Sequence, residues 1–209
     1  MNTPTKNTDL QQSERLKKQL DFIIEVDKLK HILRRTLLTD ASRRENDAEH
    51  SWHLALAAII LEEYACEKIN MEKVLKMVIV HDLVEIYAGD TFAFDVQAHA
   101  DKENRELLAA DTLFSQLPSD MGSQIRALWE EFDAMQSADA LFAASLDRLQ
   151  PFLHNTLTGG HTWIAASATV QQVLDRMEPV KRGLPALWPW VAEYIEIGIQ
   201  EGWIIGDCR

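Results

Sequence analysis

Residues 78–90 have the sequence Val78-Ile79-Val80-His81-Asp82-Leu83-Val84-Glu85-Ile86-Tyr87-Ala88-Gly89-Asp90. Apolar residues recur at helical spacing from Leu75 to Ile86, which predicts a mostly buried helix over about residues 71–88 that ends at Gly89. Glu85 follows His81 by four positions and Asp82 by three, so it shares a face with both. Burying an ionised carboxylate costs several kcal/mol unless another charge compensates it. The stretch therefore predicts a divalent cation beside this helix.

Length and composition indicate one domain. The chain has 209 residues, of which 46% are apolar, enough for a single sizeable core. Its apolar runs are shorter than the roughly 20 residues that a membrane span needs. The polar residues 1–13 predict a flexible tail, followed by one domain over 14–209. Two cysteines, Cys66 and Cys208, favour a reducing cytoplasm over a disulfide framework.

The formal net charge of −12 argues against long DNA or RNA as a partner, because affinity for a polyanion depends largely on Lys and Arg at phosphates. A single nucleotide is compatible with this charge, since a metal ion and one arginine suffice to hold its phosphate.

Helical periodicity covers nearly the whole chain and predicts a single all-α domain, a helical bundle with a metal site between helices. No segment alternates apolar and polar residues well enough to predict a strand. Asn46 and Glu49 form a capping-box pattern at one helix start, after a polar loop at 39–46. The apolar last helix predicts core packing or a homodimer surface. The predicted helices cover about residues 14–38, 46–66, 71–88, 96–116, 120–135, 138–157, 167–178 and 187–202.

Two further residues are candidate metal ligands. His50 lies on the apolar face of its helix, where it is either a hydrogen-bonded core histidine or a ligand. Asp147 follows a run of alanines, and Pro151 lacks the N–H that would bond the carbonyl of residue 147. The aspartate is therefore either a structural group or a ligand.

These residues, in this order, resemble the H…HD…D arrangement of the HD-domain metal-dependent phosphohydrolases, and in particular their 5′-deoxynucleotidase branch. The resemblance covers roughly residues 20–155. The motifs that carry it are Arg34-Arg35-Thr36, Arg44-Glu45-Asn46, Ala48-Glu49-His50-Ser51, His81-Asp82-Leu83-Val84-Glu85, Gly89-Asp90-Thr91-Phe92 and Leu146-Asp147-Arg148-Leu149.

The resemblance implies that His50, His81, Asp82 and Asp147 bind one divalent metal. Two imidazoles and two carboxylates suit Mn²⁺, Co²⁺, Fe²⁺, Ni²⁺ or Zn²⁺ and do not distinguish among them. Such an ion lowers the pKa of a bound water and neutralises phosphate oxygens. Glu85 is then placed to transfer a proton; the alternative is an outward carboxylate paired with a lysine.

The resemblance also implies a substrate pocket. Arg35 falls where the family keeps an arginine for the phosphate, although Arg34 beside it leaves the register open by one position. Asp90 falls at a second acidic position of the active pocket, near the sugar; the alternative is that it caps the turn after Gly89. Thr36 occupies the position of a tryptophan in bacterial deoxynucleotidases, which puts strict selectivity for deoxyribose in question.

The implied function is a phosphomonoesterase that releases phosphate from (deoxy)nucleoside 5′-monophosphates by attack of metal-bound water. Alternatives are hydrolysis of another phosphorylated metabolite or of a nucleoside triphosphate, and a non-catalytic nucleotide-sensing protein. The expected partner is thus a small phosphorylated molecule. The protein itself is expected to be a homodimer in the cytoplasm.

Overall fold

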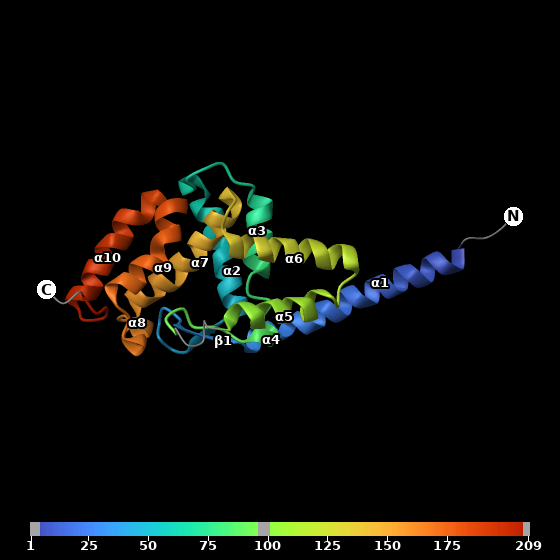
Figure 1. Cartoon of the computed structure of the whole chain (residues 1–209), viewed down its shortest axis with the longest axis horizontal. Coiled ribbons are helices and arrows are strands. Elements are labelled where there is room, and N and C mark those ends of the chain that lie inside the picture. Colours follow the sequence, from blue (N-terminus) through green and yellow to red (C-terminus); the bar gives the residue numbers. More distant parts are fainter. Residues whose placement is uncertain (1–4, 96–100, 207–209) are drawn as a thin grey trace.

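The computed structural model describes residues 5–95 and 101–206, and most of them are helical (Figure 1). In chain order the elements are α1 (Thr5–Val26), η1 (Asp27–His31), β1 (Leu33–Leu37), β2 (Arg44–Asn46), α2 (Asp47–Leu61), η2 (Glu62–Tyr64), α3 (Met71–Val80), α4 (Glu85–Ala88), α5 (Lys102–Phe114), α6 (Ser119–Ala134), α7 (Ala138–Leu157), α8 (His161–Ala166), α9 (Val170–Gly183), η3 (Pro185–Leu187) and α10 (Trp188–Gln200). The predicted all-α fold class is confirmed.

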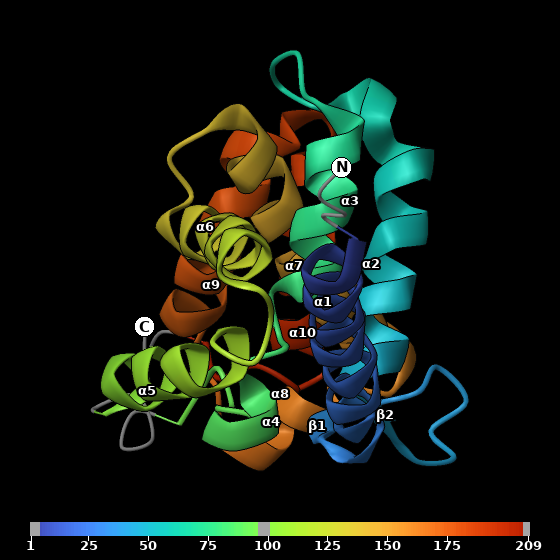
Figure 2. The ribbon, with the colours of Figure 1, turned by 90° about the vertical axis from the view of Figure 1, so that its right-hand side faces the viewer.

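Helix α7 is the centre of the larger core. It packs against α2, α3, α6, α8, α9 and β1, and twelve of its 20 residues are buried. Ala140, Ala143 and Ala144 are fully buried, and their small side chains let neighbouring helices approach closely. Figure 2 looks roughly along α1 and shows α3 and α7 between α6 and α2. This packing holds the middle of α7, which carries Asp147, against the starts and ends of other helices.

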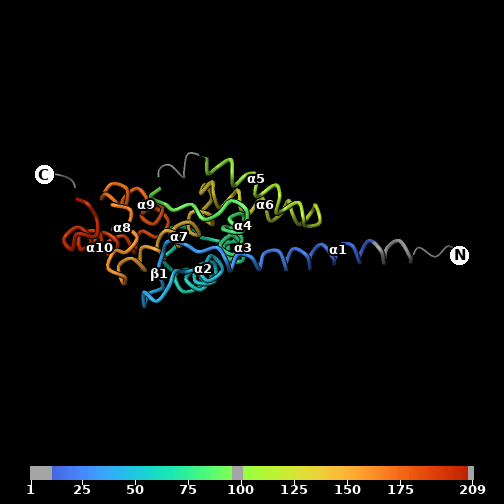
Figure 3. The backbone as a smooth tube through the Cα atoms, turned by 90° about the horizontal axis from the view of Figure 1, so that it is seen from below, coloured from blue at the N-terminus to red at the C-terminus, as the bar shows by residue number. Residues whose placement is uncertain are grey.

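A second core lies under α5 and α6, where Phe22, Val84, Leu113 and Trp129 are buried together. Helix α1 extends away from the rest of the molecule, and α10 lies at the opposite end (Figures 1 and 3). None of the helices in the described part of the chain is both long and apolar enough to cross a membrane.

A two-stranded antiparallel hairpin replaces the end of the first predicted helix and part of the predicted loop. β1 pairs with β2, with Leu33 opposite Asn46 and Leu37 opposite Arg44. The prediction of helix over 33–38 was therefore wrong. Alternate residues of β1 are buried, but these are Arg34 and Thr36 rather than apolar residues. The strand was missed because its inward face is polar.

The predicted helix over 71–88 is interrupted at His81 and Asp82. α3 ends at Val80, His81 caps it, residues 81–84 form a turn, and α4 continues to Ala88. Gly89, with φ 76°, ends this segment as predicted. His81 and Asp82 therefore lie in the turn between the two helices.

Two predictions concern the first and the last helices, and a third falls partly outside the described residues. α1 begins at Thr5 rather than near residue 14, and residues 96–100 of the predicted fourth helix lie outside the described residues. The aromatic residues of the last segment, Trp188, Trp190 and Tyr194, are partly buried against the larger core. They therefore contribute to packing rather than to an open surface.

Candidate metal centre and substrate pocket

The four predicted ligands converge from α2, α3 with its following turn, and α7. Nε2 of His50 lies 2.9 Å from Oδ1 of Asp147. Nε2 of His81 lies 3.1 Å from Oδ1 of Asp82 and 3.6 Å from Oδ1 of Asp147. All four residues are buried, with His50 fully inaccessible to solvent. Residues far apart in the sequence thus present two imidazole nitrogens and two carboxylates to one point.

Hydrogen bonds behind the two imidazoles orient their Nε2 atoms toward this point. Nδ1 of His81 lies 3.0 Å from the carbonyl oxygen of Val78, so Nδ1–H donates there and Nε2 carries the lone pair. Nδ1 of His50 lies 3.0 Å from Oε1 of Gln150 and is oriented in the same way. Burial, with the nearby Arg34 guanidinium, lowers the pKa of His50, which favours the neutral ring that binds metals.

The spacing of these atoms fits one transition-metal ion. Nitrogen and oxygen ligands at roughly 2.0–2.2 Å from an ion lie about 3.0 Å apart at right angles and about 3.4 Å apart in a tetrahedron. The observed separations of 2.9, 3.1 and 3.6 Å bracket these values. In addition, the buried Nε2 of His81 has no hydrogen-bond partner among the described residues. A cation between the rings and the carboxylates would satisfy this atom and separate the facing acceptors.

Local sequence explains how two of the ligands are positioned. The Asn46 side chain accepts a hydrogen bond from the backbone N–H of Glu49, and the Glu49 side chain accepts one from Asn46. This predicted capping box is confirmed, and it fixes the first turn of α2, where His50 lies. On α7, the helix continues through Pro151, so Asp147 is held within a regular helix rather than at its end.

Arg34, and not Arg35, contacts the carboxylates of this centre. Nη1 of Arg34 lies 2.8 Å from Oδ2 of Asp82 and 3.5 Å from Oδ1 of Asp47. Burial alone would lower the pKa of Arg34, but the carboxylates of Asp82, Glu85 and Asp47 outweigh it and raise that pKa. Arg35, one position along the strand, makes no such contact; it is exposed and lies 6.0 Å from the centre of the Phe92 ring.

Glu85 is buried beside two other carboxyl groups. Carboxylate oxygens of Asp47, Asp82 and Glu85 lie within 4.8 Å of one another. Burial and the charges of Asp82 and Asp47 raise the pKa of Glu85 well above its usual value, and burial raises that of Asp47 to about 7. An outward Glu85 paired with a lysine is therefore wrong. A buried carboxyl group with a raised pKa is suited to general acid–base work.

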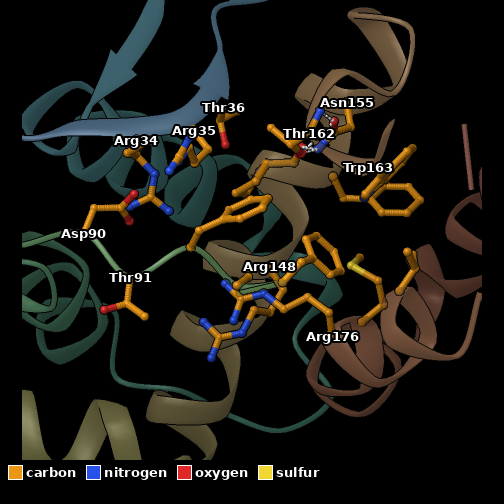
Figure 4. Close-up of a pocket in the computed structure, with 17 residues that line it drawn as sticks. Arg34, Arg35, Thr36, Asp90, Thr91, Arg148, Asn155, Thr162, Trp163 and Arg176 are labelled. Atoms are coloured by element: carbon orange, nitrogen blue, oxygen red, sulfur yellow. Dashed lines mark hydrogen bonds between the residues drawn. The ribbon is translucent and has the colours of Figure 1, made fainter. Parts of the chain in front are cut away.

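Arg35, Thr36 and Asp90 line one pocket together with Arg34, which also contacts the predicted metal ligand Asp82 (Figure 4). Burial and the charge of Asp82 raise the pKa of Asp90, although Arg34 acts in the opposite direction. The aromatic walls include Phe92. The cavity volume available to the centres of water molecules is about 70 Å³, which holds about five water molecules.

Several residues of the site escaped sequence reasoning. Arg148 and Arg176 line the same pocket, and Gln150 links His50 to Glu45, with Nε2 2.6 Å from the Glu45 carboxylate. Arg148 and Gln150 lie one and three positions after Asp147 in the sequence. This proximity to a predicted ligand was the one feature that could have indicated them. Arg176 carries no sequence signal, because α9 reaches the site only through its packing on α7.

Asp47 was also missed. It is fully buried and lies between the Arg44-Glu45-Asn46 and Ala48-Glu49-His50-Ser51 motifs, but an aspartate at the first position of a helix is ordinarily explained by the helix dipole.

Comparison with solved structures supports this architecture. A crystal structure described as a predicted metal-dependent phosphohydrolase, from Magnetospirillum magnetotacticum MS-1, is 46% identical and has a TM-score of 0.86, covering 91% of this chain and 96% of that one. A conserved hypothetical protein from Pyrococcus furiosus is 22% identical, with a TM-score of 0.55, and covers 87% of this chain and 99% of that one. The second likeness concerns the fold alone.

Curated relatives are more distant in sequence. The human 5′-deoxynucleotidase HDDC2 is 27% identical over 135 residues, which are 64% of this chain and 65% of the human protein. The alignment thus spans slightly less than two thirds of that relative. A family model described as an HD domain matches residues 26–188, which include every predicted ligand, and the chain therefore belongs to the HD domain family.

Proposed function

We propose that the protein is a metal-dependent phosphomonoesterase that releases phosphate from (deoxy)nucleoside 5′-monophosphates. The observation that carries the proposal is the convergence of the lone pairs of His50 and His81 on the carboxylates of Asp82 and Asp147. The name of the human relative, a 5′-deoxynucleotidase, supports the same substrate class. The ligands would be His50, His81, Asp82 and Asp147.

When bound there, a divalent ion supplies a water of lowered pKa and neutralises phosphate oxygens. Arg34 lies between the ligands and the pocket, where its guanidinium can hold two phosphate oxygens at once. A bond forms between the water oxygen and phosphorus while the bond from phosphorus to O5′ breaks. Glu85 would handle the proton that leaves the water and the proton that O5′ gains, so the products are phosphate and the nucleoside.

At the sugar, Asp90 is proposed to accept a hydrogen bond from a ribose hydroxyl, and Thr36 leaves space that a tryptophan would fill. Thr36 is buried at the pocket wall. A small side chain there gives little discrimination against a 2′-hydroxyl. We therefore expect ribonucleotides and deoxyribonucleotides to be hydrolysed at similar rates, which parallel assays of AMP and dAMP would measure.

The main test is phosphate release from a panel of 5′-mononucleotides with Mn²⁺ or Co²⁺. Asp82→Asn removes a proposed ligand, and Glu85→Gln removes the proposed proton carrier while keeping its shape. Both should abolish most of the activity; full activity in both would refute the proposal. Release of pyrophosphate or triphosphate from a nucleoside triphosphate would favour another HD hydrolase. Tight nucleotide binding without turnover would favour a sensor.

The proposal includes a homodimer in the cytoplasm. Large apolar side chains are exposed on one face of each of two helices, a feature typical of protein–protein contacts. They are Leu16, Leu20, Ile23 and Ile24 on α1, and Trp52, Leu56, Ile59 and Ile60 on α2. The exposed free thiol of Cys66 suits a reducing compartment. Sedimentation of Ile24→Glu should show a monomer if α1 forms the contact.

A further inference from the structure

The pocket in Figure 4 is basic although the protein is acidic. Arg34, Arg35, Arg148 and Arg176 line it, and among the described residues Asp90 is the one carboxylate in its lining. The whole chain has 21 lysines and arginines against 33 aspartates and glutamates. Four arginines at one cavity therefore create a local positive potential that attracts anions. One phosphate group does not require so many.

The arginines form two groups on opposite sides of Asp147. Its Oδ1 faces His50 and His81 and lies 3.9 Å from Nη2 of Arg34. Its Oδ2 accepts a hydrogen bond from Arg148 and lies 3.7 Å from Nη2 of Arg176. The two guanidinium groups thus lie beside each other at Oδ2 of Asp147, on the side of this carboxylate that does not face His50 and His81.

Close ion pairs do not balance the two positive charges of Arg148 and Arg176. Within the described part of the chain, Asp147 is the one carboxylate that lies within 4.0 Å of either guanidinium group. If Asp147 is a metal ligand, its charge is shared with the ion. Two neighbouring like charges with side chains only 16% and 31% exposed are unfavourable without an anion between them.

The elements that carry the pair hold it firmly. Arg148 is on α7 and Arg176 on α9, and these two helices pack along each other. Since both side chains line the cavity, an anion in the cavity can reach both. Beside their shared contact with Asp147, the two guanidinium groups are therefore placed to bind a ligand that enters the pocket.

We propose that Arg148 and Arg176 form a second anion-binding subsite, which takes a phosphate of the substrate other than the one that is hydrolysed. This inference rests on the proposed function, because the first phosphate must lie at the metal ligands and Arg34. The substrate class is then a nucleotide with two phosphate groups. A nucleoside 3′,5′-bisphosphate carries the second phosphate on the sugar, and a nucleoside 5′-diphosphate carries it on the first phosphate.

The test compares kcat/KM for adenosine 5′-monophosphate, adenosine 3′,5′-bisphosphate and adenosine 5′-diphosphate in three proteins. These are the unchanged chain, Arg176→Gln and the matched control Arg182→Gln, which changes an exposed arginine of the same helix that does not line the pocket. The unchanged enzyme should prefer one of the two doubly phosphorylated substrates. In Arg176→Gln that preference should fall roughly 10-fold or more, the value of one charge-assisted contact. Arg182→Gln should keep it.

Three results would overturn the subsite. The first is an unchanged enzyme with no preference for a second phosphate, and the second is the same effect in both arginine variants. The third is an equal fall of kcat/KM for all three substrates in Arg176→Gln, which would place Arg176 at the hydrolysed phosphate. If no substrate is hydrolysed, the proposed function fails, and calorimetric titration with adenosine 3′,5′-bisphosphate still tests the subsite. Binding at least 10-fold weaker in Arg176→Gln than in Arg182→Gln would support it, and equal binding would overturn it.

Discussion

Nε2 of His50 lies 2.9 Å from Oδ1 of Asp147, although 97 positions separate the two residues in the chain. His50 donates its Nδ1–H to Gln150, so in the neutral ring both facing atoms are acceptors. Two buried acceptors at this distance repel each other unless a proton or a metal ion lies between them. The folded state should therefore be stabilised by the ion that the site is proposed to bind.

We expect Mn²⁺ to raise the free energy of unfolding of the metal-free protein, by about 2.7 kcal/mol when its concentration is 100 times Kd. Thermal unfolding of chelator-treated protein, with and without Mn²⁺, measures this. Asp147→Asn should lose the Mn²⁺ effect. Asp175→Asn, an exposed change on α9, should keep it. An equal Mn²⁺ effect in both variants would remove Asp147 from the ligand set.

The two neighbouring arginines of β1 should differ in their effect on catalysis. Arg34 contacts Asp82, whereas Arg35 is exposed. Arg34→Lys keeps the charge but loses the planar fork that binds two phosphate oxygens, so kcat/KM for a 5′-mononucleotide should fall roughly 10-fold to 100-fold. Arg35→Lys is the matched control and should change it less than about threefold. A larger effect at Arg35 would restore the role that the sequence resemblance implied for it.

The difference between Arg34 and Arg35 shows what the sequence could and could not predict. Residue type and spacing made His50 and Asp147 candidates, and the resemblance to the HD-domain hydrolases was what joined them with His81 and Asp82 as one predicted group. The orientation of neighbouring side chains depends on whether residues 33–37 form a helix or a strand. Because the buried face of β1 carries Arg34 and Thr36, it lacks the apolar alternation that predicts strands.

Groups that act through another residue were also beyond prediction. Gln150 has no charge and lies on a buried helix, so a core amide is its ordinary explanation. Only the three-dimensional structure shows its Oε1 3.0 Å from Nδ1 of His50 and its Nε2 2.6 Å from Glu45. Helix α9, which brings Arg176 to the pocket, likewise depends on tertiary packing that no local pattern encodes.

Gln150 should control metal affinity through His50. Gln150→Leu removes the acceptor for Nδ1–H of His50 and leaves Glu45 without its amide donor, so the affinity for Mn²⁺ should fall about 10-fold to 100-fold. Gln150→Glu keeps an acceptor for His50 and should retain more of the affinity. Titration calorimetry with Mn²⁺ measures both. Equal affinities in the two variants would show that the bond to His50 is unimportant.

Glu106 should make stability depend on pH in a region away from the pocket. Burial, opposed by Lys102 and aided by Asp133, raises the pKa of Glu106 in the folded protein. Its contribution is therefore fully present below the unfolded pKa of about 4.3 and is lost as pH rises through the folded value. Glu106→Gln should raise the free energy of unfolding at pH 8, with a gain that shrinks toward pH 4.5. Glu103→Gln, exposed on the same helix, should show no such trend.

Two adjacent glycines before α8 should differ in tolerance to alanine. Both have positive φ, 63° at Gly159 and 70° at Gly160, so each alanine should cost about 1 kcal/mol from backbone strain. A Cβ at Gly159 meets nothing within 4 Å, whereas one at Gly160 would lie 2.4 Å from Cβ of Trp203. That atom is next to the backbone and cannot swing aside, so Gly160→Ala should cost roughly 1–3 kcal/mol more. Urea unfolding of the two variants measures the difference, and equal losses would mean that the segment around Trp203 moves freely relative to α8.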